Sequence, residues 1–483
     1  MVFSSLLFIY IFLPVNLLLY ACISDIRKKN ICVLIFSLIF YAWMSPLYLI
    51  LLSGMALISY AGARLVERYR TTTKAKVFLA VYLCITLGVL GYFKYLGFFC
   101  SIINSVANVF GTIPSVVLPV GISFYTFQLI SYVVDVYRGD IEADKKYSNV
   151  LLYASLFHQC IAGPIVRYKD IAKDLRERKT SISAMNEGIS RFCVGLAKKA
   201  LLANTCASIV EKVLPENLME CSDVTVMAAW LGGLLYMLHI YLDFSAYSDM
   251  AIGLGRMTGF YYKENFNYPY TASSITDFWR RWHISLGTFF RDYVYIPLGG
   301  NRKGRLRQLI NMFIVWGLTG LWHGADYNFV MWGLYYFAFL AAEKLVLLKL
   351  FAKLPKVIGA VVTRVYTLLV VFVGWILFRF TDMGSMIKAL RALIGLDGNE
   401  FTSFEINTVF LNNIIFIIIC IVAVTPIVKM IAGWLRQKAK SDSGMLSLGV
   451  YNLLNAALPV ILLLLSTIAL IGDSYNPFIY FRF

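Results

Sequence analysis

Charge is scarce in this sequence. Charged residues make up 15% of the 483-residue chain, against about 25% in ordinary soluble domains. Hydrophobic residues make up 59% and aromatic residues 16%, which is more apolar surface than a soluble fold buries. Runs such as residues 414–424 and 458–472 continue into neighbouring apolar sequence for about the 20 residues that a bilayer span requires. The composition therefore excludes a soluble protein and predicts transmembrane helices.

Several motifs of catalysis and metal binding are also missing. The nine cysteines include no CxxC pair and no closely spaced Cys/His set, so neither a disulfide framework nor a zinc site is expected. The chain has no GxSxG nucleophile elbow, no GxxxxGK[ST] phosphate loop and no HExxH zinc helix. We therefore expect no bound cofactor and no metal.

The net charge of +17 is carried by short basic loops between the apolar segments. These loops lie at residues 26–29, 64–76, 167–179, 302–307 and 436–440. Such loops are typical of the cytoplasmic side of a membrane protein, and their dispersal excludes a nucleic-acid-binding stripe. We count about eleven transmembrane helices, without a soluble domain or an internal repeat. The fold class expected is an all-α polytopic membrane protein, with residues 1–472 as one membrane domain.

Two stretches depart from single spans. Residues 31–63 have basic loops at both ends and Ser45-Pro46 in the middle, where proline disfavours helix at the preceding residue. This pattern predicts two short helices that return to the cytoplasm. Residues 148–166 are also bracketed by charged loops but are too short for two spans, which predicts a re-entrant or tilted segment around Gly163-Pro164.

Residues 239–333 break the apolar pattern with several ionisable side chains. Such groups cost about 2.5–3.5 kcal/mol each at membrane depth and usually mark a functional cavity. His323 lies in the mostly apolar stretch 311–333, where Gly317, Gly320 and Gly324 permit close approach of backbones. Desolvation would keep its imidazole neutral and able to accept a proton from a hydroxyl. On the residues alone, a core histidine bonded across helices is the commoner alternative.

His283 directly follows Trp282 and the basic pair Arg280-Arg281. Its position predicts a place near the cytoplasmic surface, suited to binding a donor rather than to buried proton transfer. Anchoring of the Trp/Arg cluster in the membrane interface is an equally good interpretation. His158, beside Gly163-Pro164, either lines a cavity or packs in the core.

Three polar residues in another apolar run, Asp243, Ser245 and Asp249, are candidates for lining the cavity. Asp243 follows His239 by four residues, so the two can share one side of a helix. Structural pairing of buried polar groups is the alternative, and we weight it somewhat above direct catalysis.

Several long blocks of this region resemble the membrane-bound O-acyltransferase (MBOAT) superfamily, in the bacterial branch of alginate O-acetylation and teichoic acid D-alanyl transfer proteins. The matching blocks are residues 117–139, 161–168, 241–260, 265–304 and 318–333. By position, the buried histidine of the GLWHG block is His323, and the second family histidine, in WRRWHIS, is His283. The resemblance makes both catalytic candidates, with His323 as the leading one.

The resemblance implies a ring of transmembrane helices around a central buried histidine, in a bacterial plasma membrane. The acyl donor, acetyl-CoA or a carrier-protein thioester, would enter beside Arg280, Arg281 and His283, and His323 would act as general base. The activity implied is O-acetylation of an extracytoplasmic polysaccharide, such as an alginate-like exopolysaccharide or peptidoglycan. D-alanylation of teichoic acid is the alternative within the family. A transporter or flippase is the alternative outside it, although it would predict an internal repeat.

The C-terminal tail, residues 473–483, is expected on the outer side of the membrane. The basic loop 436–440 places the start of the last span in the cytoplasm, so that span runs outward. The ending FIYFRF resembles a short aromatic motif of this acyl-transfer system, which implies that Tyr480 relays the acyl group to an extracytoplasmic SGNH or esterase-like transferase. Phe478, Phe481 and Phe483 would dock the tail or that partner. An interfacial aromatic belt is the alternative interpretation.

Overall fold

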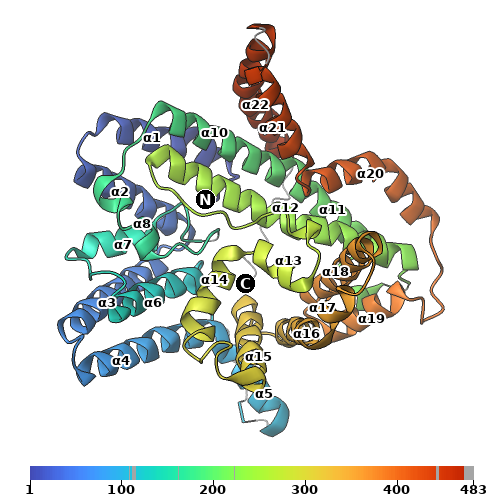
Figure 1. The fold of residues 1–483 in the computed structure, drawn as a ribbon, viewed down its shortest axis with the longest axis horizontal. Coiled ribbons are helices and arrows are strands. Elements are labelled where there is room, and N and C mark those ends of the chain that lie inside the picture. The colour runs from blue at the N-terminus through green and yellow to red at the C-terminus, as the bar shows by residue number, and fades with distance from the viewer. Residues whose placement is uncertain (108, 111–115, 162, 222, 442–444, 473–483) are drawn as a thin grey trace. The chain divides into compact units, whose positions relative to one another are not determined.

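The computed structural model describes residues 1–107, 109–110, 116–161, 163–221, 223–441 and 445–472 (Figure 1). Its regular secondary structure within these ranges is helical, with no strand. Six helical runs are long and apolar enough to cross a membrane: Tyr48–Arg68, Thr73–Ala107, Ile182–Glu220, Val226–Thr258, Lys356–Arg379 and Phe404–Ala423. Two further apolar runs, Phe8–Cys22 and Ala456–Gly472, are shorter. An all-α polytopic membrane protein is confirmed, whereas the count of about eleven spans and the ring stay predictions.

The described chain forms two compact units. The first comprises Met1–Phe192, Tyr247–Glu264 and Thr288–Pro297. Its helices, in chain order, are η1 (Phe8–Phe12), α1 (Leu13–Cys22), α2 (Ile26–Met44), α3 (Tyr48–Arg68), α4 (Thr73–Leu90), η2 (Gly91–Tyr95), α5 (Leu96–Ala107), α6 (Ile122–Arg138), α7 (Tyr147–Ser155), α8 (Tyr168–Ile171), α9 (Asp174–Glu177), most of α10 (Ile182–Ala197) and η6 (Arg291–Tyr295). Helix α3 packs against α4, α6 and α7, and α2 packs against α7.

The break predicted at Ser45-Pro46 is present. Helix α2 ends at Met44 and α3 begins at Tyr48, because proline disfavours helical backbone at the residue before it. The two helices are not short, however. They contain 19 and 21 residues, and α3 alone is long and apolar enough to span a bilayer. The prediction of two helices is confirmed, and the prediction of their shortness is wrong.

The stretch around Gly163-Pro164 also departs from regular helix as expected. Helix α7 ends at Ser155, and the irregular backbone that follows is buried in protein, with His158 and Cys160 fully shielded. Gly121 allows this close approach, because a Cβ there would lie 2.2 Å from the carbonyl oxygen of Cys160. Burial against protein is the condition under which irregular backbone is tolerated at membrane depth. The re-entrant path itself stays a prediction.

The second unit comprises Cys193–Ala246, Asn265–Gly287 and Leu298–Phe483. Its helices are η3 (Lys198–Ala203), α11 (Asn204–Val213), η4 (Leu218–Glu220), most of α12 (Val226–Thr258), η5 (Pro269–Thr271), α13 (Ile275–Arg281), the start of α14 (Ile284–Phe290), α15 (Gly304–His323), α16 (Tyr327–Ala342), η7 (Glu343–Leu347), α17 (Leu348–Phe351), α18 (Lys356–Arg379), α19 (Met383–Leu393), α20 (Phe404–Ala423), α21 (Ile427–Ser441) and α22 (Met445–Gly472). In Figure 1, α16 lies between α15 and α18, and it packs against both.

Glycines allow α15 and α16 to pack closely. A Cβ on Gly320 would lie 2.3 Å from the carbonyl oxygen of Phe329, and one on Gly333 would lie 2.4 Å from that of Trp316. Gly324 is also tightly enclosed, by the ring of Phe329. Gly317 has no neighbour within 4 Å of the position of its Cβ, so its predicted role in close packing is wrong. The close packing fixes the end of α15, which carries His323.

Candidate active site

His323 is the last residue of α15 and only 3% of it is exposed, as the sequence predicts. Three aromatic rings surround the imidazole: Trp322 at 4.9 Å, Trp332 at 5.0 Å and Phe378 at 5.3 Å between ring centroids. All three meet it edge to face. An imidazole in such an enclosure is shielded from bulk water, which favours its neutral form.

The chain ends α15 immediately after His323. Gly324 is extended, with φ −167° and ψ 155°, and the Asp326 side chain accepts a hydrogen bond from the Tyr327 amide at the start of α16. The side-chain amide of Asn328, the second residue of α16, donates to the carbonyl oxygens of Leu377 and Phe378 on α18. These bonds connect the α15–α16 turn to the strip of α18 that presents Phe378 to His323.

His283 is buried inside the protein, and its predicted place near the cytoplasmic side of the membrane stays a prediction. Only 1% of it is exposed, whereas Arg280, three residues earlier, is exposed. The physical reason is the backbone between α13 and α14, where His283 adopts φ 44° in the left-handed region. A non-glycine residue in that region is strained by about 1–3 kcal/mol and needs tertiary support. The turn directs the ring inward, where it contacts Phe244 at 4.7 Å and Trp322 at 5.8 Å.

Asn265 determines which nitrogen of the neutral His283 ring carries the hydrogen. Its Oδ1 accepts hydrogen bonds from the backbone amide and the hydroxyl of Ser285, at 3.2 and 2.8 Å. The same oxygen lies 3.3 Å from His283 Nδ1. Since a backbone amide can only donate, this atom is the amide oxygen, so Nδ1 must carry a proton and donate to it. His283 Nε2 then holds the lone pair.

The remaining nitrogen of His283 is therefore available for chemistry. Nε2 is buried and has no hydrogen-bond partner among the described residues. Burial lowers the pKa of His283 to about 3, so the ring is neutral at physiological pH. A neutral, oriented imidazole with a bare Nε2 can accept a proton or a hydrogen bond from a bound substrate.

Trp322 brings the two histidines together. Its indole ring packs against both His323 and His283, with ring centroids 4.9 and 5.8 Å apart. Sequence reasoning assigned His323 to the buried core and His283 to a cytoplasmic surface. The structure places both in one buried cluster of the second unit.

The three polar candidates on α12 have structural partners. Asp243 is fully buried and pairs with Lys199 of η3, 2.7 Å apart, while Asp249 pairs with Arg191, 2.6 Å apart. The Ser245 hydroxyl lies 3.4 Å from the carbonyl oxygen of Leu242, one turn earlier. The structural pairing considered for the two carboxylates is therefore present, and their role in lining a cavity stays a prediction.

The two basic candidates on α13 differ. Arg281 forms an ion pair with Asp277, one turn earlier, at 3.0 Å. Arg280 is exposed, and its positive charge adds to the effect of burial in lowering the pKa of Lys344. The tryptophans beside them pack against other aromatic rings. Trp279 packs on Trp316, Trp332 and Tyr336, and Trp282 is buried.

Sequence reasoning missed Glu343. Its carboxylate is fully buried and accepts hydrogen bonds from the amides of Ile275 and Thr276, at 2.6 and 2.9 Å, and from the Thr276 hydroxyl. It thus caps the N-terminus of α13, the helix that leads into His283. Lys199, the buried partner of Asp243, was missed as well. Both are charged residues inside apolar sequence, a signal that could have identified them.

Two further candidates have different outcomes. His158 packs in the first unit, where its Nδ1 lies 3.0 Å from the Tyr262 hydroxyl. Tyr480, with the rest of residues 473–483, lies outside the described residues, so its relay role stays a prediction.

Comparison with known proteins agrees with the resemblance of the motifs. The model of the MBOAT, membrane-bound O-acyltransferase family, matches residues 141–378. The chain is 36% identical to a probable alginate O-acetylase AlgI of Pseudomonas putida, over 100% of both chains. It is 31% identical to a peptidoglycan O-acetyltransferase of Helicobacter pylori, over 82% of this chain and 80% of that one. A teichoic acid D-alanyltransferase of Bacillus subtilis is 28% identical over 45% of this chain and 56% of its own.

The apolar helices and the match to the family model identify a membrane-embedded transferase of acyl groups. The chain belongs to the membrane-bound O-acyltransferase family. It is an acyltransferase of the branch that includes these bacterial O-acetylating and D-alanylating relatives.

Proposed function

We propose that this protein takes an acetyl group from a cytoplasmic thioester, acetyl-CoA or an acetylated carrier protein, and passes it across the bacterial plasma membrane for O-acetylation of an extracytoplasmic polysaccharide. The observation that carries the proposal is the pair of buried histidines on either side of Trp322. The full-length likeness to a probable alginate O-acetylase supports acetyl as the group and a polysaccharide as the acceptor. The likeness to a D-alanyltransferase covers less than half of the chain and supports D-alanylation less well.

The chemistry needs one base and one leaving group. His323 accepts the proton of the attacking hydroxyl while that oxygen forms a bond to the thioester carbonyl carbon. The tetrahedral intermediate then breaks its C–S bond, and the thiolate takes the proton from His323. General base assistance of this kind contributes about 10²–10⁴-fold to the rate. His283, oriented by Asn265, assists at the same cluster through its bare Nε2.

The hydroxyl that attacks first belongs to Tyr480 in this proposal. A phenol with a pKa near 10 is a better leaving group than a sugar hydroxyl, so a tyrosyl ester can pass its acetyl group onward. An extracytoplasmic SGNH or esterase-like transferase then moves the group to the polysaccharide. Arg280 and Arg281 serve the donor side, where guanidinium groups suit phosphate or an acidic carrier surface.

The relay is tested by peptide mass spectrometry on the purified full-length protein incubated with isotopically labelled acetyl-CoA or with a labelled acetyl carrier protein. The proposal predicts label on Tyr480 in the wild type and none in Tyr480→Phe, which keeps the ring and removes only the hydroxyl. A Tyr480→Phe protein that still supports full polymer acetylation in cells would reduce the tail to a membrane anchor. Label from neither donor would reject the acetyl assignment.

A further inference from the structure

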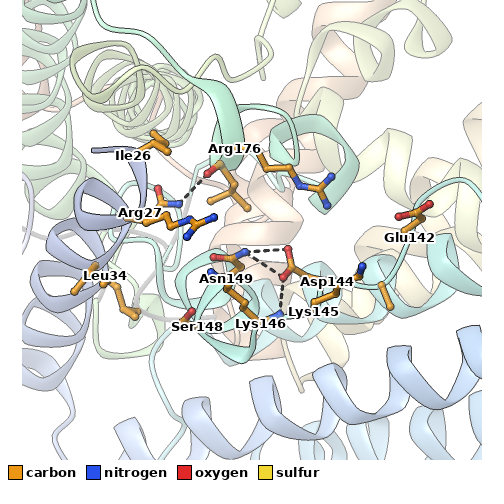
Figure 2. A pocket seen from close by; sticks show the side chains of 14 residues that line it. Ile26, Arg27, Leu34, Glu142, Asp144, Lys145, Lys146, Ser148, Asn149 and Arg176 are labelled. Carbon is orange, nitrogen blue, oxygen red and sulfur yellow. Dashed lines mark hydrogen bonds between the residues drawn. The ribbon is translucent and has the colours of Figure 1, made fainter. Parts of the chain in front are cut away.

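A polar pocket with a volume of about 500 Å³ lies in the first unit, remote in sequence from both histidines. It lies at the N-termini of two helices, because the first residues of α2 and α7 contribute to its lining. The positively charged residues that line it are Arg27, Lys145, Lys146 and Arg176. In Figure 2, Arg27 and Arg176 lie above the hydrogen-bonded pair Asn149 and Asp144.

The pocket carries an excess of positive charge. Its four cations face two carboxylates, Glu142 and Asp144. Asp144 is buried, and its oxygens accept hydrogen bonds from the Tyr168 hydroxyl, the Lys146 amide and the Asn149 side chain. The side chains of the four cations are exposed, and none forms an ion pair with a carboxylate in the described part of the chain. The positive end of α7 adds to the excess because α7 begins without a side-chain cap, whereas the start of α2 is capped by the Asp25 carboxylate.

An apolar ridge begins at the wall of this pocket. Ile31 lines the pocket and is 53% exposed. Along α2, residues at intervals of four continue the ridge, with Ile35 at 50%, Ile39 at 47% and Trp43 at 62% exposure. Residues four apart form a continuous row along a helix surface, and Arg27 stands one turn before Ile31 in the same row. A cationic recess and an exposed apolar row therefore meet at the start of α2.

We propose that this pocket binds the phosphate headgroup of an anionic phospholipid whose acyl chain lies along the α2 ridge. The ligand must combine an anion with a long apolar tail, because the recess and the ridge are contiguous. A soluble phosphate would occupy the recess alone, whereas a phospholipid would contact the recess and the ridge together. The basic loops at residues 26–29 and 144–146 have the composition of cytoplasmic loops, and anionic lipids attract basic segments at that leaflet. The site does not depend on acyl transfer.

The test uses native mass spectrometry of the full-length protein after reconstitution in bilayers that mix phosphatidylglycerol and phosphatidylcholine. The wild type is expected to retain phosphatidylglycerol in preference to phosphatidylcholine. Arg27→Gln/Arg176→Gln is expected to lose that preference by roughly tenfold, since each cation near an anionic membrane surface contributes to attraction. The matched control is Lys74→Gln/Lys76→Gln, which removes two exposed charges at the start of α4, outside the pocket.

Three outcomes decide the proposal. Loss of phosphatidylglycerol in the pocket variant but not in the control supports it. Equal retention in the two variants, or equal retention of both lipids by the wild type, overturns it. Displacement of the retained lipid by millimolar adenosine 3′,5′-bisphosphate would show that the recess takes soluble phosphates, and would overturn the lipid assignment. A circular dichroism melt of each variant establishes that the exposed substitutions leave the fold intact.

Discussion

A single oxygen atom of Asn265 orients the ring of His283. That oxygen is held in place by two donors from Ser285, and it holds the Nδ1 proton of the imidazole. The opposite nitrogen, Nε2, is thereby left as a lone pair inside a buried cluster. In the proposed mechanism Asn265 is a positioning residue, because it would act on the reaction only through His283.

Replacement of Asn265 should therefore change the pH dependence of the reaction. Burial lowers the pKa of His283 to about 3, so the wild-type ring stays neutral over the working range. Asn265→Asp places a carboxylate beside Nδ1, which favours the imidazolium and raises that pKa. We expect the acyl-transfer rate of Asn265→Asp to fall as pH drops through the raised pKa, whereas the wild-type rate shows no such loss there.

The control for this experiment is Asn311→Ala. It removes another buried amide of the second unit, which donates to the carbonyl oxygen of Gly300, and so shows the effect of losing a buried amide without placing a charge beside a histidine. A rate that is merely lower by a constant factor at every pH, in Asn265→Asp as in Asn311→Ala, would show that Asn265 is only structural.

Arg280 and Arg281 should not contribute equally to donor binding. The charge of Arg281 is engaged by Asp277, whereas Arg280 is exposed beside the like charge of Lys344. Arg280→Ala is expected to raise the KM for the donor by about tenfold, the value of one hydrogen bond to a charged group, with little change in kcat. Arg281→Ala should change it less. Steady-state kinetics with a varied donor measures both, and equal donor KM values in wild type and Arg280→Ala would refute the assignment.

Elements far apart in sequence support the residues of the site. Glu343 caps α13 from a position 68 residues further along the chain, and Lys199 neutralises Asp243 from a different helix. Helical periodicity does not predict pairs of this kind. The sequence shows that a charged residue lies in an apolar segment, but it does not show which residue is its partner. The apolar run around His323 is different. Its length and its glycines predicted burial, and the α15–α16 contact through Gly320 shows why.

The burial of the His283 ring beside an exposed arginine has a local cause. The adjacent Arg280 and Arg281 suggested a surface position, and Arg280 does lie at the surface. The backbone of His283 is in the left-handed region at φ 44°, and its ring packs against Phe244 and Trp322. Such a conformation at a non-glycine residue depends on tertiary contacts, here with Asn265 and the surrounding rings. The residue type of His283 alone therefore does not predict this turn.

The contribution of the Lys199–Asp243 ion pair to stability can be measured by comparing single and double variants. Both side chains are almost fully buried, so Lys199→Met leaves an uncompensated carboxylate and is expected to cost about 3–5 kcal/mol of stability. Lys199→Met/Asp243→Leu removes both charges and should recover most of that loss. Thermal unfolding in detergent gives the order of the Tm values. A double variant less stable than Lys199→Met would contradict the pairing.

At the scale of the whole molecule, the sequence predicted the family and the membrane character because both depend on long blocks and on composition. The number of transmembrane spans is harder to predict from the sequence. Only six helical runs of the described chain are long and apolar enough to cross a bilayer, and two further apolar runs, Phe8–Cys22 and Ala456–Gly472, are shorter. Helices that pack on protein rather than lipid need not be uniformly apolar, so hydropathy alone does not separate the two.

The central claim is that His323 provides the base for acyl transfer to an extracytoplasmic polysaccharide. The most direct measurement is mass spectrometry of the O-acetyl content of cell-envelope polysaccharide, in cells that carry the wild-type gene, no gene, His323→Ala or His158→Ala. His158 is the matched control, since it is a buried histidine of the first unit, outside the His283–His323 cluster. We expect His323→Ala to lower acetylation by about a hundredfold or more, to the level of the deletion, with membrane levels of the protein unchanged and with His158→Ala retaining most of the activity. Wild-type acetylation by a normally inserted His323→Ala protein would contradict the account.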